Sequence, residues 1–316
     1  MGSHKKVVIA LGGNALQEAN TPATAEAQLE VIKKTAEVIS DIKCMFGYEL
    51  AIAHGNGPQV GRILLASETA SAVTPAMPFD VCAAMSQGYI GYHIQQGLSH
   101  ALANRNRKLP VVSLITQVVV DKDDPAFKNP TKPIGPFYSE AEAKVLAEEK
   151  GYVMKEDAGR GWRRVVASPM PKRIVEIHSV KELWDSTIVV TVGGGGIPVI
   201  ESEDGTLEGV AAVIDKDLAA EKLAEEVGAD ILMILTEVEK VSINFRKPDQ
   251  KDIDRMTLAE CEQYVAEGHF APGSMLPKIQ AAMMFAKSAP GRKAIITSLS
   301  KAVEALKGET GTEITL

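Results

Sequence analysis

A run of five apolar residues near the N-terminus, residues 7–11, constrains the fold more than any other stretch of the chain. Such an uninterrupted run is typical of a central strand in a parallel sheet, buried on both faces. Gly12 and Gly13 end the run, because glycine enters a tight turn without a steric cost, and Asn14 follows as a cap. A turn of this kind at the carboxyl edge of an α/β sheet is a usual place for an anionic ligand, and a plain β-turn is the competing interpretation.

The same arrangement recurs along the chain. Residues 48–53 and 187–192 predict two further buried strands, which end in the glycine-rich turns 54–61 and 193–196. Segments with a 3.6-residue apolar repeat alternate with the strands and predict helices over residues 24–46, 81–105 and 218–227. We therefore expect an α/β fold with a doubly wound, mainly parallel central sheet and helices on both faces, a three-layer αβα arrangement.

The overall composition narrows the class of protein. The chain has 316 residues, of which 45% are hydrophobic and 24% charged, as in an ordinary globular protein. A net charge of −7 argues against a nucleic-acid partner, and the absence of a run of 18 apolar residues argues against a transmembrane helix. Three widely spaced cysteines without a CxxC pair indicate a reducing, cytoplasmic environment rather than a disulfide framework or a zinc site.

Residues 121–178 differ in character from the rest. Four prolines interrupt residues 121–138, after a strand predicted over residues 111–120, and a short helix is predicted over residues 140–150. We interpret this segment as a small lid that protrudes from the main sheet and closes over a site. Lys132 lies on one of its proline-stiffened loops, and spacing alone favours a solvated surface lysine there.

Several glycine patterns exclude common nucleotide motifs. The turn at residues 54–61 has the spacing G-x-G-x-x-x-G, one residue longer than the dinucleotide fingerprint, and no acidic residue ends the next strand. No glycine is followed by lysine, which excludes a Walker A loop. The four successive glycines 193–196 predict a backbone that a phosphate approaches closely, with a flexible connector as the weaker alternative.

Gly88 and Gly91, inside the helix 81–105, predict close packing by another element, within the fold or at a subunit interface.

The sharpest chemical signal is Lys216, between Asp215 and Asp217 at the start of a predicted helix. Both aspartates are ordinary at a helix N-terminus, but a cation there is electrostatically disfavoured. Lys278 occupies the same position in a later helix. Two lysines so placed predict that they face an anion, which indicates phosphate chemistry.

Taken together, these stretches resemble the amino-acid kinase superfamily and, within it, the carbamate kinase family. The resemblance runs in the family's order from residue 10 to residue 278 and rests on the segments 10–15, 54–61, 85–88, 130–135, 156–161, 193–198, 213–217, 234–236 and 271–275. It implies a cytoplasmic enzyme that transfers a phosphoryl group reversibly between carbamoyl phosphate and ADP, the ATP-forming step of arginine and carbamoyl phosphate catabolism. Catalysis of phosphoryl transfer requires mainly that the reactants are aligned and that cations and N–H groups surround the transferred group. The glycine turns and the two lysines described above are suited to this.

The resemblance also implies residue roles. Lys216 and Lys278 would neutralise phosphate oxygens, Asp217 would hold both lysines, and Lys132 would reach in from the lid. The carbamoyl phosphate end would be held by Gly12, Gly13, Asn14, Gly55, Asn56 and Gly57, with Gly194 and Gly195 near the transferred group. The nucleotide would contact Asp215, Lys216, Thr236, Glu237, Val238, Met275 and Lys278. Mg²⁺ is implied by the nucleotide phosphates, and no carboxylate cluster identifies protein ligands for it.

At the level of domains, the resemblance implies one domain over residues 1–316, with a substrate lobe over about 1–200, a nucleotide lobe over about 201–316 and the lid over 121–178. It suggests a homodimer whose ligands are small molecules. Three rival interpretations remain: another acyl kinase such as an acetylglutamate kinase type, a non-catalytic sensor on this fold, and a nicotinamide-dependent dehydrogenase. Many acetylglutamate kinases carry a lysine on the first strand where this chain has Ala10.

Overall fold

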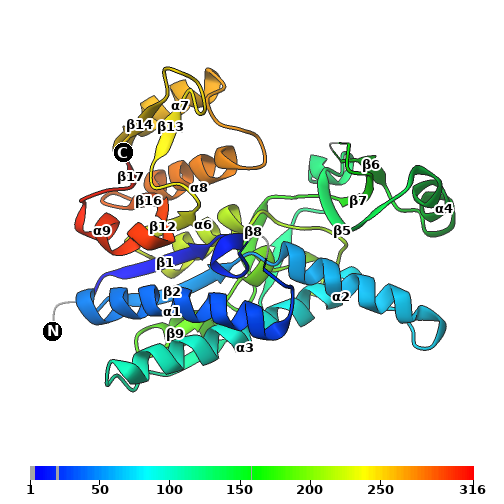
Figure 1. Ribbon diagram of the computed structural model, residues 1–316, viewed down its shortest axis with the longest axis horizontal. Coiled ribbons are helices and arrows are strands. Elements are labelled where there is room, and N and C mark those ends of the chain that lie inside the picture. Colours follow the sequence, from blue (N-terminus) through cyan, green and yellow to red (C-terminus); the bar gives the residue numbers. More distant parts are fainter. Residues whose placement is uncertain (1–3, 19–20, 158) are drawn as a thin grey trace.

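The structure, a computed structural model, describes residues 4–18, 21–157 and 159–316. Its centre is an eight-stranded sheet in which only the β16–β17 pair is antiparallel. From one edge to the other, the strands are β15 (Arg255–Thr257), β17 (Thr312–Thr315), β16 (Lys293–Ser298), β12 (Ile231–Thr236), β1 (Lys6–Leu11), β2 (Glu49–His54), β9 (Ile188–Val190) and β3 (Val111–Ser113). Figure 1 shows the sheet between helices. The predicted mainly parallel, doubly wound α/β fold is confirmed.

Alternate residues of β1 pack on opposite helical layers, which explains the unbroken apolar run. Val8 and Ala10 belong to one buried cluster with residues of α5, α6, α7 and α8, whereas Ile9 belongs to another with residues of α1, α3 and α9. The helices are α1 (Ala25–Phe46), α2 (Gly57–Thr69), α3 (Phe79–Asn104), α4 (Glu140–Lys150), α5 (Ile177–Trp184), α6 (Lys216–Val227), α7 (Leu258–Ala266), α8 (Met275–Ser288) and α9 (Ala302–Lys307).

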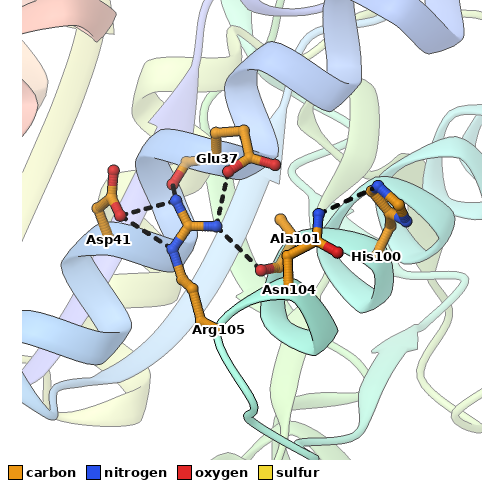
Figure 2. A network of polar contacts seen from close by, with 6 residues as sticks. All are labelled: Glu37, Asp41, His100, Ala101, Asn104 and Arg105. Carbon is orange, nitrogen blue, oxygen red and sulfur yellow. Dashed lines mark hydrogen bonds and ion pairs between the residues drawn. The ribbon is translucent and has the colours of Figure 1, made fainter.

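The C-terminal end of α3 is tied to α1 by ion pairs. The Arg105 guanidinium lies 2.6 Å from Glu37 and 2.7 Å from Asp41, and it also donates to the carbonyl oxygen of Ala101 at 2.9 Å (Figure 2). Burial by itself would lower the pKa of Arg105, but Glu37 and Asp41 outweigh burial and raise that pKa. The network joins α1 and α3, two of the helices on one face of the sheet.

A second sheet of four strands adjoins the first, and it corrects one prediction. The strand predicted over residues 111–120 is wrong, because β3 ends at Ser113 and β4 joins this second sheet. The chain turns at Thr116, whose backbone N–H bonds to the side chain of Gln87 instead of to a neighbouring strand. The four strands, in order, are β11 (Leu207–Gly209), β10 (Ile197–Glu201), β4 (Gln117–Val120) and β8 (Pro171–Ile174).

A three-stranded sheet protrudes from the body of the molecule and carries α4 on it (Figure 1). Its strands are β5 (Lys132–Tyr138), β7 (Trp162–Val166) and β6 (Met154–Glu156). The predicted helix over residues 140–150 is confirmed. Lys132, however, begins a strand and does not lie on a loop, because β5 pairs with β7 in spite of its two prolines. A separate hairpin consists of β13 (Val241–Ile243) and β14 (Lys251–Ile253). In the chain it comes before β15 and α7.

Candidate active site

Three glycine turns meet at the carboxyl edge of the central sheet. The strands β1, β2 and β9 are neighbours in the sheet, all parallel, and each is followed directly or within three residues by one of these turns. Leu11 pairs with His54, so Gly12 and Gly55 leave the sheet side by side. Strand order therefore brings together turns that lie almost two hundred residues apart in sequence.

The turn at residues 193–196 fits closely against both of its neighbours. Gly194 and Gly195 have φ angles of 67° and 91°, which strongly favour glycine. A Cβ on Gly194 would lie 2.2 Å from the Asn56 side-chain nitrogen, and one on Gly195 would lie 2.3 Å from the Ile214 carbonyl oxygen. This turn is thus held between the second glycine turn and the segment that leads into α6.

The strongest charge cluster at this edge is built on Asp217, whose side chain is only 3% exposed. Lys216 Nζ lies 2.5 Å from one carboxylate oxygen and Lys278 Nζ lies 3.0 Å from the other. α6 begins at Lys216 and α8 begins at Met275, so both lysines lie in the first turn of a helix as the sequence predicts. Burial by itself would raise the pKa of Asp217, but the two ammonium groups outweigh burial and hold that pKa below its usual range.

The protruding sheet contributes a third lysine. Lys132 Nζ lies 3.3 Å from a carboxylate oxygen of Asp215, which also caps α6 by accepting the backbone N–H of Asp217 at 2.9 Å. Three ammonium groups therefore face two carboxylates within one cluster. The excess positive charge is suited to hold a phosphate group, which carries more than one negative charge.

A cavity of about 800 Å³ opens beside this cluster. It is lined by most of the predicted nucleotide residues and by the first glycine turn, namely Gly12, Gly13, Asn14, Lys216, Thr236, Glu237, Val238, Met275 and Lys278. The predicted residues Lys132, Gly55, Asn56, Gly194, Gly195, Asp215 and Asp217 lie outside its lining. Gly57 lines a second cavity of about 470 Å³, between α2 and the protruding sheet.

The sequence of this chain matches the amino acid kinase family over residues 5–298. The chain belongs to the amino acid kinase family. Its relatives include the carbamate kinases of Clostridium perfringens and Pyrococcus horikoshii, both 55% identical over 98% of this chain and 99% of their own length. The structure superposes on the Giardia lamblia carbamate kinase bound to AMP-PNP with a TM-score of 0.94, at 46% identity, covering 100% of this chain and 99% of that one. The predicted resemblance to carbamate kinases is confirmed.

Some lining residues of this kinase were missed by the sequence analysis. The connection after β13 appears in the sequence only as an exposed loop, yet Phe245, Arg246 and Lys247 line the 800 Å³ cavity. Phe245 is 49% exposed, and a large exposed aromatic between basic residues is the signal that could have found it. A ring and cations so placed are suited to a base and to phosphates.

The described residues include no group of three or more histidine, cysteine or acidic side chains placed to hold a metal ion. Asp217 is already engaged by two lysines, and Asp215 by Lys132 and a backbone N–H. The part of the chain that the structure describes also contains no helix of the length and apolarity needed to cross a bilayer.

Proposed function

We propose that this amino acid kinase transfers a phosphoryl group between carbamoyl phosphate and ADP. In the ATP-forming direction an oxygen of the ADP β-phosphate attacks the phosphorus, and the bond between phosphorus and the carbamoyl oxygen breaks. Carbamate leaves and decomposes to ammonia and carbon dioxide. The identity to carbamate kinases over nearly the whole chain supports this choice within the family.

The observation that carries the proposal is the pair of lysines on Asp217 at the junction of the glycine turns and the cavity. Negative charge spreads over the equatorial oxygens of the transferred group in the transition state, and pre-aligned ammonium groups stabilise that charge without reorganisation. Asp217 holds both lysines in place. Asp217 itself is a positioning residue, because its oxygens are taken up by the lysines.

We assign the two ends of the reaction to two sides of this cluster. ADP occupies the 800 Å³ cavity, with its base toward residues 236–238 and its phosphates toward Lys216 and Lys278. Carbamoyl phosphate lies against the backbone N–H groups of the turns at Gly12, Asn56 and Gly194, whose glycines leave room for close approach. The transferred group then sits between them, over the lysine pair.

The protruding sheet acts as a lid in this proposal. Lys132, 36% exposed, now pairs with Asp215, and substrate phosphate would compete with that carboxylate for its ammonium group. Lys132 would move from Asp215 to the phosphate, so closure of the lid would depend on bound substrate. Mg²⁺ would come with the nucleotide, because the described residues offer no group of acidic side chains placed to hold it, and it would supply positive charge that neutralises the phosphates.

A comparison of phosphoryl donors tests the proposed substrate. ATP formed from ADP and Mg²⁺ is measured with carbamoyl phosphate, acetyl phosphate or acetylglutamyl phosphate as donor. We expect the highest kcat/KM with carbamoyl phosphate. A higher value with either other donor would replace this assignment by another acyl kinase, and no ATP with any donor would support the non-catalytic sensor.

We further propose that two copies of this cytoplasmic enzyme pair through one face of α3. Val81, Met85 and Tyr92 are 37%, 49% and 56% exposed at a spacing of four and seven residues, which places them on one helix face. Between them, a Cβ on Gly88 would meet no atom within 4 Å, whereas one on Gly91 would collide with Ser113 of β3. Gly91 therefore serves internal packing, and Gly88 leaves room for a partner helix. Sedimentation equilibrium should give a dimer that Tyr92→Glu converts to a monomer.

A further inference from the structure

Two adjacent buried side chains in the N-terminal half of α3 touch the second and third glycine turns of the site. Ser86 is 0% and Gln87 is 2% exposed. The segment 85–88 contributes to the resemblance with carbamate kinases, but neither residue had a predicted role. Buried polar side chains are costly unless they are fully hydrogen-bonded, so their partners indicate what they do.

Gln87 uses its whole amide group to join two backbone segments. Its Oε1 accepts the backbone N–H of Thr116 at 2.8 Å, and its Nε2 donates to the carbonyl oxygens of Thr116 at 3.1 Å and Gly193 at 2.9 Å. Gly193 begins the turn that holds Gly194 and Gly195. Gln87 thus joins the start of this turn to the chain between β3 and β4, beside the bonds that Thr116 accepts from the backbone N–H groups of Val192 and Ile197.

Ser86 fixes the facing turn. Its Oγ accepts the side-chain N–H of Asn56 at 2.8 Å and donates to the carbonyl oxygen of Ala83 at 2.6 Å. The Asn56 amide in turn lies flush against Gly194, since a Cβ there would be 2.2 Å from its nitrogen and 2.7 Å from its oxygen. Two consecutive residues of one helix therefore set the positions of both turns.

His54 completes the enclosure of Gly193. A Cβ on Gly193 would lie 2.5 Å from His54 Nε2 and 3.0 Å from Gln87 Cγ, so the two side chains close on this glycine. His54 Nδ1 donates to the carbonyl oxygen of Gly55 at 2.8 Å. Burial lowers the pKa of His54 to about 4, so the ring is neutral at the pH at which the enzyme would work.

We propose that Gln87, supported by Ser86, is a positioning residue that sets the separation of the Asn56 and Gly194 turns for the phosphoryl donor. This inference rests on the proposed function. Gln87 is buried and bonds to the carbonyl oxygen of Gly193, so it acts on the donor site through this glycine. If its amide is removed, the buried N–H of Thr116 loses its partner, and the carbonyl oxygens of Thr116 and Gly193 keep only the backbone N–H groups of Ile197 and Gly196, so the turn shifts to recover hydrogen bonds. A misplacement of about 1 Å in such a site costs on the order of 100-fold in rate.

The test compares Gln87→Met with Gln95→Met. Gln95 lies on the same helix and donates to the carbonyl oxygen of Val111 at 3.0 Å, so its replacement also removes a side chain-to-backbone bond but leaves both turns untouched. For Gln87→Met we expect kcat/KM for carbamoyl phosphate to fall by about 100-fold. The KM for ADP should stay within about twofold, because the ADP cavity does not include residues 193–196. Gln95→Met should leave both parameters unchanged.

Gln87→Glu adds a readout that a merely structural role would not move. Its buried carboxyl should have a raised pKa, and only the protonated form can donate to the Gly193 carbonyl oxygen. Activity relative to the parent enzyme should therefore rise as the pH is lowered from about 8 to 6. His54 faces the same turn and cannot cause this change, since its pKa of about 4 keeps it neutral throughout.

The proposal is overturned if Gln87→Met lowers thermal stability with unchanged kcat/KM, if it raises the KM for ADP in parallel, or if Gln95→Met gives an equal loss. Should Gln87→Met not fold, Ser86→Ala decides the question: about a tenfold loss for carbamoyl phosphate alone supports it, and an unchanged rate refutes it. If the unmodified enzyme does not turn over carbamoyl phosphate, the proposed function is refuted instead. The variants test only the role of Gln87, so the two outcomes are distinguishable.

Discussion

Replacing Lys216 by methionine removes one of the two ammonium groups on Asp217 while keeping an unbranched side chain. The stem matters because a Cβ on Gly55 would lie 3.3 Å from Lys216 Cδ, so alanine would also open a gap beside the second glycine turn. Loss of one pre-aligned donor to a transition-state charge costs about 3–4 kcal/mol, which lowers kcat by about 10²–10³-fold.

The stability cost of Lys216→Met should be much smaller. Leaving a buried charge wholly unpaired costs about 3–5 kcal/mol. Asp217, however, keeps Lys278 at 3.0 Å, so we expect about 1–2 kcal/mol, a fall in Tm of a few degrees. Lys216→Arg should not restore kcat, because a planar fork does not replace a compact ammonium group in a close-packed site.

The assay is kcat for ATP formation together with thermal unfolding of the same preparation. Lys293→Met is the matched control: Lys293 pairs with Glu313 at 2.6 Å and begins β16, at the opposite end of the sheet from the glycine turns. It should lose some stability and no activity. The reasoning is refuted if Lys216→Met unfolds at much lower temperature yet keeps its kcat, since Lys216 would then be a structural residue.

Three further perturbations follow from the geometry. Lys132→Met should lower kcat by at least about tenfold with little change in ADP affinity, measured by steady-state kinetics and ADP titration; unchanged kcat would remove the lid lysine from the mechanism. Burial raises the pKa of Glu221 to about 7, so the folded chain holds a proton that the unfolded chain releases, and stability falls as the pH rises from about 4.5 to 7. Glu221→Gln should therefore add up to about 3 kcal/mol to the free energy of unfolding at pH 8 and much less at pH 5, and an equal gain at both pH values would contradict the assignment. Arg105→Met should lower that free energy by about 1–2 kcal/mol in urea denaturation without affecting kcat, because its partners Glu37 and Asp41 are both about half exposed; a loss of activity would point to coupling through α3.

The sequence predicted those parts of the site that depend on local pattern. An unbroken apolar run identified β1 as a central strand, and the unfavourable position of Lys216 at a helix N-terminus indicated an anion without any knowledge of the fold. Asp217 adjoins Lys216 in the chain, so its role was also within reach. Lys278 lies 61 residues further on, and only the packing of α8 beside α6 brings it to the same carboxylate.

Some features depend on which distant segment a stretch of chain pairs with or packs against, and these could not be predicted from the sequence. The sequence of residues 111–120 does not reveal that its two halves belong to different sheets, because that division depends on the side chain of Gln87 reaching Thr116. The pairing of β5 with β7 turned the expected loop at Lys132 into a strand. Likewise, the connection at Phe245 looks like an ordinary exposed loop until its position beside the cavity is known.

Direct observation of phosphoryl transfer by ³¹P NMR tests the central claim most simply. The unmodified enzyme is mixed with carbamoyl phosphate, ADP and Mg²⁺, and the phosphorus signals are followed with time. We predict that the carbamoyl phosphate signal falls as the γ-phosphate signal of ATP rises, in a one-to-one ratio and far faster than without enzyme. Release of inorganic phosphate without ATP, or no change beyond spontaneous decay, would contradict the account.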